Sequence, residues 1–315
     1  MYATARPHTS PRKAWRVSQL VLRVMTNFRL GQAYHSLGQY PRAMDCLRPN
    51  LELISDDLLL ERMYSAGLPS VFSRIWLALC LAELGEFAQA LAMGDEAFRT
   101  AETGDPGYSL ALACVGLGNV HLAKGDFDRA VTVLERGMSR DSGEPIERAW
   151  PFLASALGAA YTHLGRAGDA LPLLEQAVER AGALKLKANQ SLRMALLAEA
   201  LLKAGGTERA FTVAAQALDL AQEHRERGHE AHIQRLLASI ELGRDTPALD
   251  QAESGYRTAL ALAGELGMRP LEAHCRLGLG RVRRRTGDPE TATTETAAAR
   301  DLFRLLGMTS WADES

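Results

Sequence analysis

One pattern recurs along this chain: an apolar helical run, a glycine, and an alanine five residues after it. A fixed period near 40 residues is typical of stacked-repeat proteins, in which each unit buries its apolar face on the next. The sixth unit has Gly243-Arg244-Asp245-Thr246-Pro247 in place of the glycine. The alanines are Ala43, Ala90, Ala130, Ala170, Ala210, Ala252 and Ala292, at intervals of 47, 40, 40, 40, 42 and 40 residues. The glycines are Gly38, Gly85, Gly125, Gly165, Gly205 and Gly287.

The residues around the glycine predict two helices joined by a tight turn. Glycine adopts the left-handed conformation that ends a helix without strain. Asp126 and Asp288 follow it as candidate N-caps of the second helix. An aromatic residue follows in three units and is expected to fill the gap between the two helices; these residues are Tyr40, Phe87 and Phe127.

Small residues in the first helix predict that the second helix crosses it closely. Large residues at Leu47, Leu134 and Leu174 are expected to fill the interface that the small residues leave. The small positions are Gly31, Ala78, Gly118, Gly158, Ala198 and Gly280.

The string Leu30-Gly31, Tyr34, Leu37-Gly38, Tyr40 and Ala43 resembles the tetratricopeptide repeat, and it recurs as Leu157-Gly158, Tyr161, Leu164-Gly165 and Ala170. That unit usually has 34 residues, so each unit here carries about six more. The resemblance covers residues 24–306. It implies an all-α fold, a right-handed tetratricopeptide-repeat superhelix (α-solenoid) of about seven helix-turn-helix units and about fourteen helices.

The expected organisation has three parts. Residues 1–14 form a disordered or irregular lead, residues 15–306 form the solenoid, and residues 307–315 form a C-terminal cap. The cap is expected because a last repeat otherwise leaves an apolar face in water. Trp311 is its one large aromatic residue.

A narrower resemblance rests on Glu265-Leu266-Gly267-Met268-Arg269-Pro270-Leu271 and Leu171-Pro172-Leu173-Leu174-Glu175-Gln176. These stretches are similar to the C-terminal repeat region of bacterial signalling proteins in which a class III adenylate or guanylate cyclase precedes an AAA-type ATPase. This chain has no Gly-Lys pair for a P-loop and no room for a cyclase domain, so only the repeat region can be transferred. Whether it is a stand-alone product or a fragment stays open.

Composition excludes several partner classes. The net charge is −2, so no strong field attracts nucleic acid or an anionic membrane. No apolar run reaches the 18 residues of a membrane span. Four scattered cysteines indicate reduced thiols in a cytoplasmic protein, and the scarcity of lysine beside arginine suggests a bacterial source. No cofactor is expected.

Clusters that resemble catalytic or metal sites have simpler interpretations. His229 and His232 have metal-ligand spacing, but nearby arginines repel a cation, so no metal is expected. Histidines at equivalent positions of several units stand about 10 Å apart, too far to share an ion. The basic run at Arg281–Arg285 is interpreted as a solvated helix end, with an anion or phosphate site as the alternative. Nucleophile and zinc-protease motifs are absent from the sequence, and we expect no enzyme.

The inner wall of the superhelix is the best candidate site. Helical positions counted from the Leu-Gly pair in the first helix of each unit place aromatic, amide and charged residues on this wall. Such a surface favours a peptide or partner protein held through apolar anchors. An alternative is that the aromatic residues are core. A receptor for a small peptide or metabolite and, more remotely, an enzyme are the other functions considered. Partner identity and oligomeric state, a homo-oligomer included, stay open. The predicted groove residues are Phe72, Trp76, Asn119, Phe152, Ser155, Arg193, Glu199 and Lys203.

Overall fold

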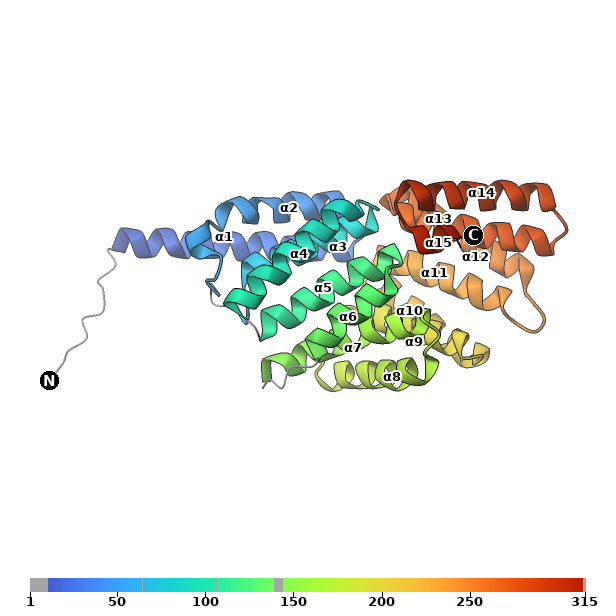
Figure 1. The fold of residues 1–315 in the computed structure, drawn as a ribbon, viewed down its shortest axis with the longest axis horizontal. Helices are drawn as coiled ribbons and strands as arrows, with labels where there is room; N and C mark the ends of the chain where they lie inside the picture. Colours follow the sequence, from blue (N-terminus) through green and yellow to red (C-terminus); the bar gives the residue numbers. More distant parts are fainter. Residues whose placement is uncertain (1–10, 64, 106, 139–143, 314–315) are drawn as a thin grey trace.

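The computed structural model describes residues 11–63, 65–105, 107–138 and 144–313, and in those residues the secondary structure is helical throughout, with no strand (Figure 1). The long helices form seven pairs, and a short helix follows them. The helices are α1 (Pro11–Ser36), α2 (Tyr40–Leu53), the short 3₁₀ helix η1 (Asp56–Leu58), α3 (Pro69–Glu83), α4 (Phe87–Gly104), α5 (Tyr108–Lys124), α6 (Phe127–Met138), α7 (Glu144–His163), α8 (Ala167–Ala183), α9 (Gln190–Lys203), α10 (Thr207–Glu223), α11 (Arg227–Leu242), α12 (Leu249–Leu266), α13 (Arg269–Arg285), α14 (Pro289–Leu305) and α15 (Thr309–Asp313).

The turns within pairs follow the glycine pattern. All six predicted turn glycines have a positive φ, between 72° and 92°. In the sixth unit α11 ends at Leu242, Gly243 has a right-handed φ of −86°, and the chain needs the longer stretch to Ala248 before α12 begins. Asp288 caps α14 by accepting a hydrogen bond from the Thr291 backbone N–H at 3.1 Å. The Asp126 carboxylate instead pairs with Lys124 Nζ at 2.8 Å.

Close helix crossing inside a pair confirms the predicted small-to-large packing. A Cβ added to Gly31 would lie 2.5 Å from Leu47 Cγ, and the same holds for Gly158 and Leu174 at 2.6 Å. Leu47 and Leu174 are 0% exposed. Burying a leucine stabilises the fold by about 1.5 to 3 kcal/mol, so these contacts hold each pair together.

The pairs stack into two layers. Each first helix packs on the first helix of the next unit, whereas each second helix packs on its own first helix and on the next one. The first helices α3, α5, α7, α9, α11 and α13 therefore form the inner wall, and the second helices form the outer wall.

The superhelix closes on itself, so that its C-terminal helices contact its N-terminal ones. Helix α11 contacts α1, and α13 contacts α3, although these helices lie far apart in the sequence (Figure 1). Tyr40 Oη lies 3.8 Å from Met268 Sδ. A Cβ on Gly85 would lie 2.7 Å from Leu306, and one on Gly125 would lie 2.8 Å from Trp311. The turns of the first three units thus pack against the α12–α13 connection, the α14–α15 connection and the cap.

The connections between successive units carry a second set of left-handed residues. Lys185, Arg225, Gly267 and Gly307 all have φ between 53° and 73° and end a second helix. The next residue donates its N–H five residues back, as Met268 does to the Ala263 carbonyl at 2.8 Å and Met308 to the Phe303 carbonyl at 2.9 Å. This helix-ending motif turns Met268 and Met308 inward, where both are 0% exposed.

At the ends of the chain, residues 1–10 of the predicted irregular lead lie outside the described residues, and the chain is helical from Pro11. Residues 309–313 form α15, which packs on α14. Among the described residues no helix combines the length and the apolar character that crossing a membrane requires.

Candidate functional site

The structure divides the eight predicted groove residues by exposure. Lys203 is exposed, and four others are partly exposed: Trp76, Asn119, Phe152 and Glu199. Phe72, Ser155 and Arg193 are buried, with 6%, 5% and 2% of their surfaces exposed. These three side chains lie between helices and not on an open wall.

Phe72 and Ser155 have structural contacts. The Phe72 ring packs 5.8 Å from Phe28 and edge-on at 6.0 Å from Tyr108, measured between ring centroids, so it joins the first three units. The Ser155 hydroxyl donates to the Pro151 carbonyl in its own helix at 2.5 Å.

Trp76 and Asn119 lie on adjoining first helices, α3 and α5. The Trp76 ring stands edge-on to His35, with ring centroids 4.9 Å apart. Asn119 Nδ2 donates to the Val115 carbonyl at 2.8 Å. This bond fixes the amide plane and leaves the side-chain oxygen as an acceptor.

Phe152 and Arg193 form a pair between α7 and α9. The guanidinium carbon lies 4.9 Å from the Phe152 ring centroid. Arg193 Nη2 donates to the carbonyls of Leu186 at 3.2 Å and Ala188 at 2.6 Å. Burial lowers the pKa of Arg193 to about 10, although the charge of Glu226 acts in the opposite direction.

Glu199 and Lys203 stand one turn apart on α9. Glu199 Oε1 accepts from Arg235 Nη2 of α11 at 3.3 Å, and the two side chains are 18% and 21% exposed. Burial alone would raise the pKa of Glu199, but the positive charges of Arg235 and His163 outweigh it and lower that pKa. All three charged residues of the predicted set therefore lie on α9, whereas the aromatic ones lie on α3 and α7.

Three residues at the closure, His35, Glu83 and His232, were not predicted as a site. His232 Nε2 lies 3.1 Å from Glu83 Oε2 and links α11 to α3. His35 Nε2 is buried without a hydrogen-bond partner. Burial lowers the pKa of His35 to about 4, opposed by Glu83. The sequence signal that points to this place is the aromatic residue after the turn, which occurs only in the first three units.

Ser191, Glu226 and His229 come together, but not as a catalytic triad. The Ser191 hydroxyl donates to Glu226, and His229 Nδ1 lies 3.0 Å from the Ser191 oxygen and 3.2 Å from Glu226 Oε2. Serine and carboxylate thus share one imidazole nitrogen, whereas a proton relay needs one on each side. Ser191 is also 0% exposed, so a substrate cannot reach it.

The histidine cluster and the basic run considered in the sequence form ion pairs and hydrogen bonds within the protein. His229 and His232 face different carboxylates, Glu226 and Glu83. In the described residues no group of three potential metal ligands comes together. In the basic run, Arg283 pairs with Glu253 and Arg285 donates to the Leu242 carbonyl.

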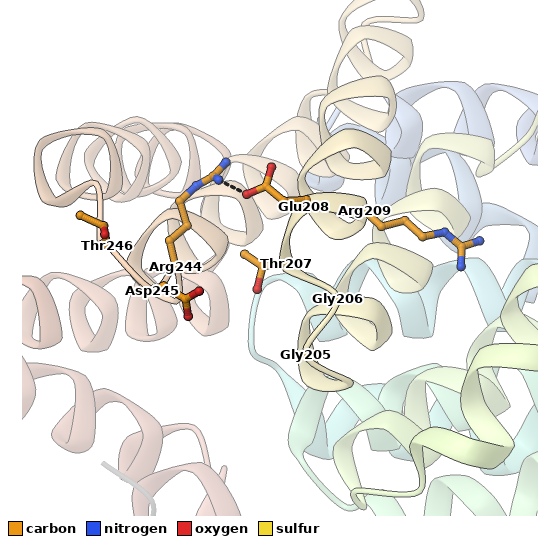
Figure 2. Close-up of a pocket in the computed structure, with 8 residues that line it drawn as sticks. All are labelled: Gly205, Gly206, Thr207, Glu208, Arg209, Arg244, Asp245 and Thr246. Atoms are coloured by element: carbon orange, nitrogen blue, oxygen red, sulfur yellow. Dashed lines mark hydrogen bonds and ion pairs between the residues drawn. The ribbon is translucent and has the colours of Figure 1, made fainter.

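A depression of about 520 Å³ lies away from the inner wall, where the turn after α9 faces the turn after α11. Figure 2 shows Arg244 reaching across it to Glu208, with which it forms an ion pair. Glu208 and Arg244 therefore neutralise each other, and Arg209 pairs with Glu175 outside the depression at 2.8 Å. The lining residues are Gly205, Gly206, Thr207, Glu208, Arg209, Arg244, Asp245 and Thr246.

Comparison with known proteins supports the fold. Models of the tetratricopeptide repeat match residues 113–146, 153–184, 71–93 and 273–304. No curated protein matches the sequence. The chain is an all-α tetratricopeptide-repeat superhelix.

Several solved structures share this architecture over most of their length. The Rap conjugation gene regulator of plasmid pLS20, in complex with the Phr* peptide, has a TM-score of 0.67 and 12% identity and covers 99% of this chain and 82% of its own. A Rap protein complexed with competence and sporulation factor has a TM-score of 0.65 and 14% identity, over 92% and 78%. NprR in complex with its cognate peptide NprX has a TM-score of 0.58 and 16% identity, over 86% and 80%.

Proposed function

We propose that this protein is a non-enzymatic scaffold or sensor that binds a peptide, or an extended segment of a partner protein, on the inner wall of its superhelix. The carrying observation is the set of partly exposed side chains on successive first helices: Trp76 on α3, Asn119 on α5, Phe152 on α7 and Glu199 on α9. Aromatic anchors between groups that hydrogen-bond a backbone suit an extended peptide.

Two further points support a peptide. Three of the similar structures are complexes with the Phr* peptide, the peptide NprX or competence and sporulation factor, and each covers at least 86% of this chain. Closure of the superhelix also brings α11 and α13 opposite α1 and α3. A ligand on the inner wall then contacts several units at once and need not lie on one flat face.

The setting we propose is signalling in the bacterial cytoplasm, with the chain acting as the arm that recognises a partner. The resemblance to the repeat region of cyclase–ATPase signalling proteins motivates this proposal. A small metabolite remains the alternative ligand; it is less favoured because the described depression lies between two turns, and Glu208 and Arg244 in its lining already pair with each other.

The test uses a peptide selected from a random display library on the purified protein, with its Kd measured by fluorescence anisotropy. We expect Trp76→Ala and Asn119→Ala each to weaken binding about tenfold or more, the equivalent of about 1.4 kcal/mol. Gln216→Ala on outer helix α10 is the matched amide control, because Gln216 is exposed. Unchanged affinity in the two folded inner-wall variants would rule out this wall as the site.

A further inference from the structure

Arg193 is a buried cation that has no carboxylate partner. Its side chain lies in the first turn of α9 and is 2% exposed. Nη2 donates to two backbone carbonyls, and Nε reaches Gln190 Oε1 at 3.3 Å. Nη1 is buried and makes no hydrogen bond. Both N–H groups of Nη1 are therefore unsatisfied, and the charge of the guanidinium is not neutralised by contact.

Such an arrangement is unfavourable by itself. Removing an arginine from water carries a large desolvation penalty unless an anion or a full set of hydrogen bonds compensates. Arg74 gives the comparison within this chain. It is similarly buried, at 6% exposure, but its Nη2 pairs with Glu96 Oε1 at 2.6 Å.

Glu226, the acidic group whose charge raises the pKa of Arg193, does not provide this partner. The carboxylate of Glu226 instead forms hydrogen bonds with Ser191 and His229. Glu226 is itself 7% exposed and held in that network. Arg193 is thus left with carbonyl oxygens and the face of Phe152.

A second observation at the same place also points to an anion. Like most helices of this chain, α9 begins without a side-chain cap, and its N-cap residue Asn189 has a left-handed φ of 57°. The N-terminus of a helix carries a partial positive charge and free N–H groups, which attract anions. Lys185 and Lys187, both exposed, flank this turn and add positive charge.

We propose that the first turn of α9 and Arg193 Nη1 form an anion site that receives a carboxylate of the bound peptide. This proposal rests on the proposed function and names a chemical feature of its ligand. Gln190 is the side chain that gives way, because its bond to Nε is long. Phe152, partly exposed and lying against the guanidinium, contacts the apolar part of the ligand beside the carboxylate.

The first experiment needs no peptide. The thermal unfolding midpoint is measured in sodium acetate, in inorganic phosphate and in chloride, all at equal ionic strength. Acetate at a concentration several times its Kd is expected to raise the midpoint by about 2 °C. Arg193→Gln is expected to abolish the rise, and the matched variant Arg74→Gln is expected to keep it while lowering overall stability.

Three results overturn the proposal: no rise in the unaltered protein, an equal rise in Arg193→Gln, or a rise with phosphate alone. If Arg193→Gln does not fold, NMR of the unaltered protein labelled in its arginines replaces it. The Arg193 Nε–H resonance must then shift with acetate in a saturable manner, and an unmoved resonance refutes the site.

The second experiment separates this proposal from the peptide function. The carboxylates of the selected peptide are neutralised one at a time, by C-terminal amidation and by Asp→Asn or Glu→Gln changes. One neutralisation is expected to weaken binding at least tenfold in the unaltered protein and less than twofold in Arg193→Gln. Tight binding that no neutralisation weakens refutes the carboxylate site and leaves the peptide function standing.

Discussion

The same glycine turn occurs in two different settings in this molecule. In the first three units the turn is covered: Gly38 lies against Leu266, Gly85 against Leu306, and Gly125 against Trp311. In the fourth, fifth and seventh units a Cβ on the glycine would meet nothing within 4 Å; those glycines are Gly165, Gly205 and Gly287. All six have the left-handed conformation.

The difference shows that the glycine and the residue two positions after it have separate roles. The glycine ends the first helix in every unit, which is a local task. The residue two positions later is Tyr40, Phe87 or Phe127 where the turn is covered. In the open turns it is small or short, namely Ala167, Thr207 or Pro289. The aromatic residue therefore marks the turns that carry the closure of the superhelix.

The largest expected effect follows from removing the first of these aromatic residues. Tyr40 is 2% exposed and contacts Met268, whose own exposure is 0%. Tyr40→Ala should lower the free energy of unfolding by about 4 kcal/mol, as a large buried side chain is lost and a cavity remains. Urea unfolding, monitored by circular dichroism, measures this free energy. Thr207→Ala, at the same position of an open turn, should change stability by less than about 0.5 kcal/mol. Equal losses in the two variants would mean that closure adds nothing.

Trp311→Ala tests the closure from its C-terminal side, where the tryptophan covers the turn at Gly125. The ring packs edge-on against Phe127 at 5.5 Å, His163 at 5.5 Å and His274 at 4.6 Å, between centroids. It is partly exposed, so we expect a loss of about 3 kcal/mol, at the lower end for such a truncation. Increased amide hydrogen exchange should appear in both α6 and α15. Exchange confined to α15 would show that the tryptophan caps only the last unit.

The fold of each unit was predictable because its determinants are local. Gly31 opposite Leu47 and Gly158 opposite Leu174 are contacts within one helix pair, and the turn glycine acts on the residues beside it. Closure was not predicted, because Tyr40 and Met268 are 228 residues apart. Their approach depends on small rotations summed over several units. The second set of glycines, Gly267 and Gly307, was visible in the sequence, but its meaning depends on this curvature.

The candidate site was predictable only in part for a related reason. Counting along each helix identifies one face, but the first helix of the next unit covers part of that face. This is why Phe72, Ser155 and Arg193 are buried while Trp76 is partly exposed. Arg235 was missed because its partner Glu199 lies on another unit, 36 residues away.

Acid should weaken the closure through His35. Its pKa is about 4 in the folded protein, lowered by burial from 6.5. Between these values the unfolded chain binds more protons, so this contribution to stability is complete above about pH 6.5 and is lost as pH falls to 4. Allowing for partial exposure, the loss is about 2 kcal/mol.

The control for this pH dependence is His35→Phe, which keeps an aromatic ring against Trp76 and Tyr40. Urea unfolding at pH 7.5 and pH 4.5 should show a smaller difference in the variant than in the unaltered protein. Part of the difference will remain, because burial also holds the pKa of His274 well below its usual value. An unchanged difference would assign the whole effect to His274 or to other groups.

The smallest expected effect gives the sharpest comparison between covered and open turns. Gly125→Ala and Gly165→Ala both place a side chain at positive φ, which costs about 1 to 2 kcal/mol in each case. Only at Gly125 does the new Cβ also meet a neighbour, Trp311 Cδ1 and Nε1 at 2.8 Å. We therefore expect Gly125→Ala to be about 1 kcal/mol more destabilising, from overpacking against a rigid ring. In a Trp311→Ala background the two glycine variants should become equally costly, because the ring that distinguishes them is gone. A difference that persists without the tryptophan would place its cause inside the third unit and not in the closure.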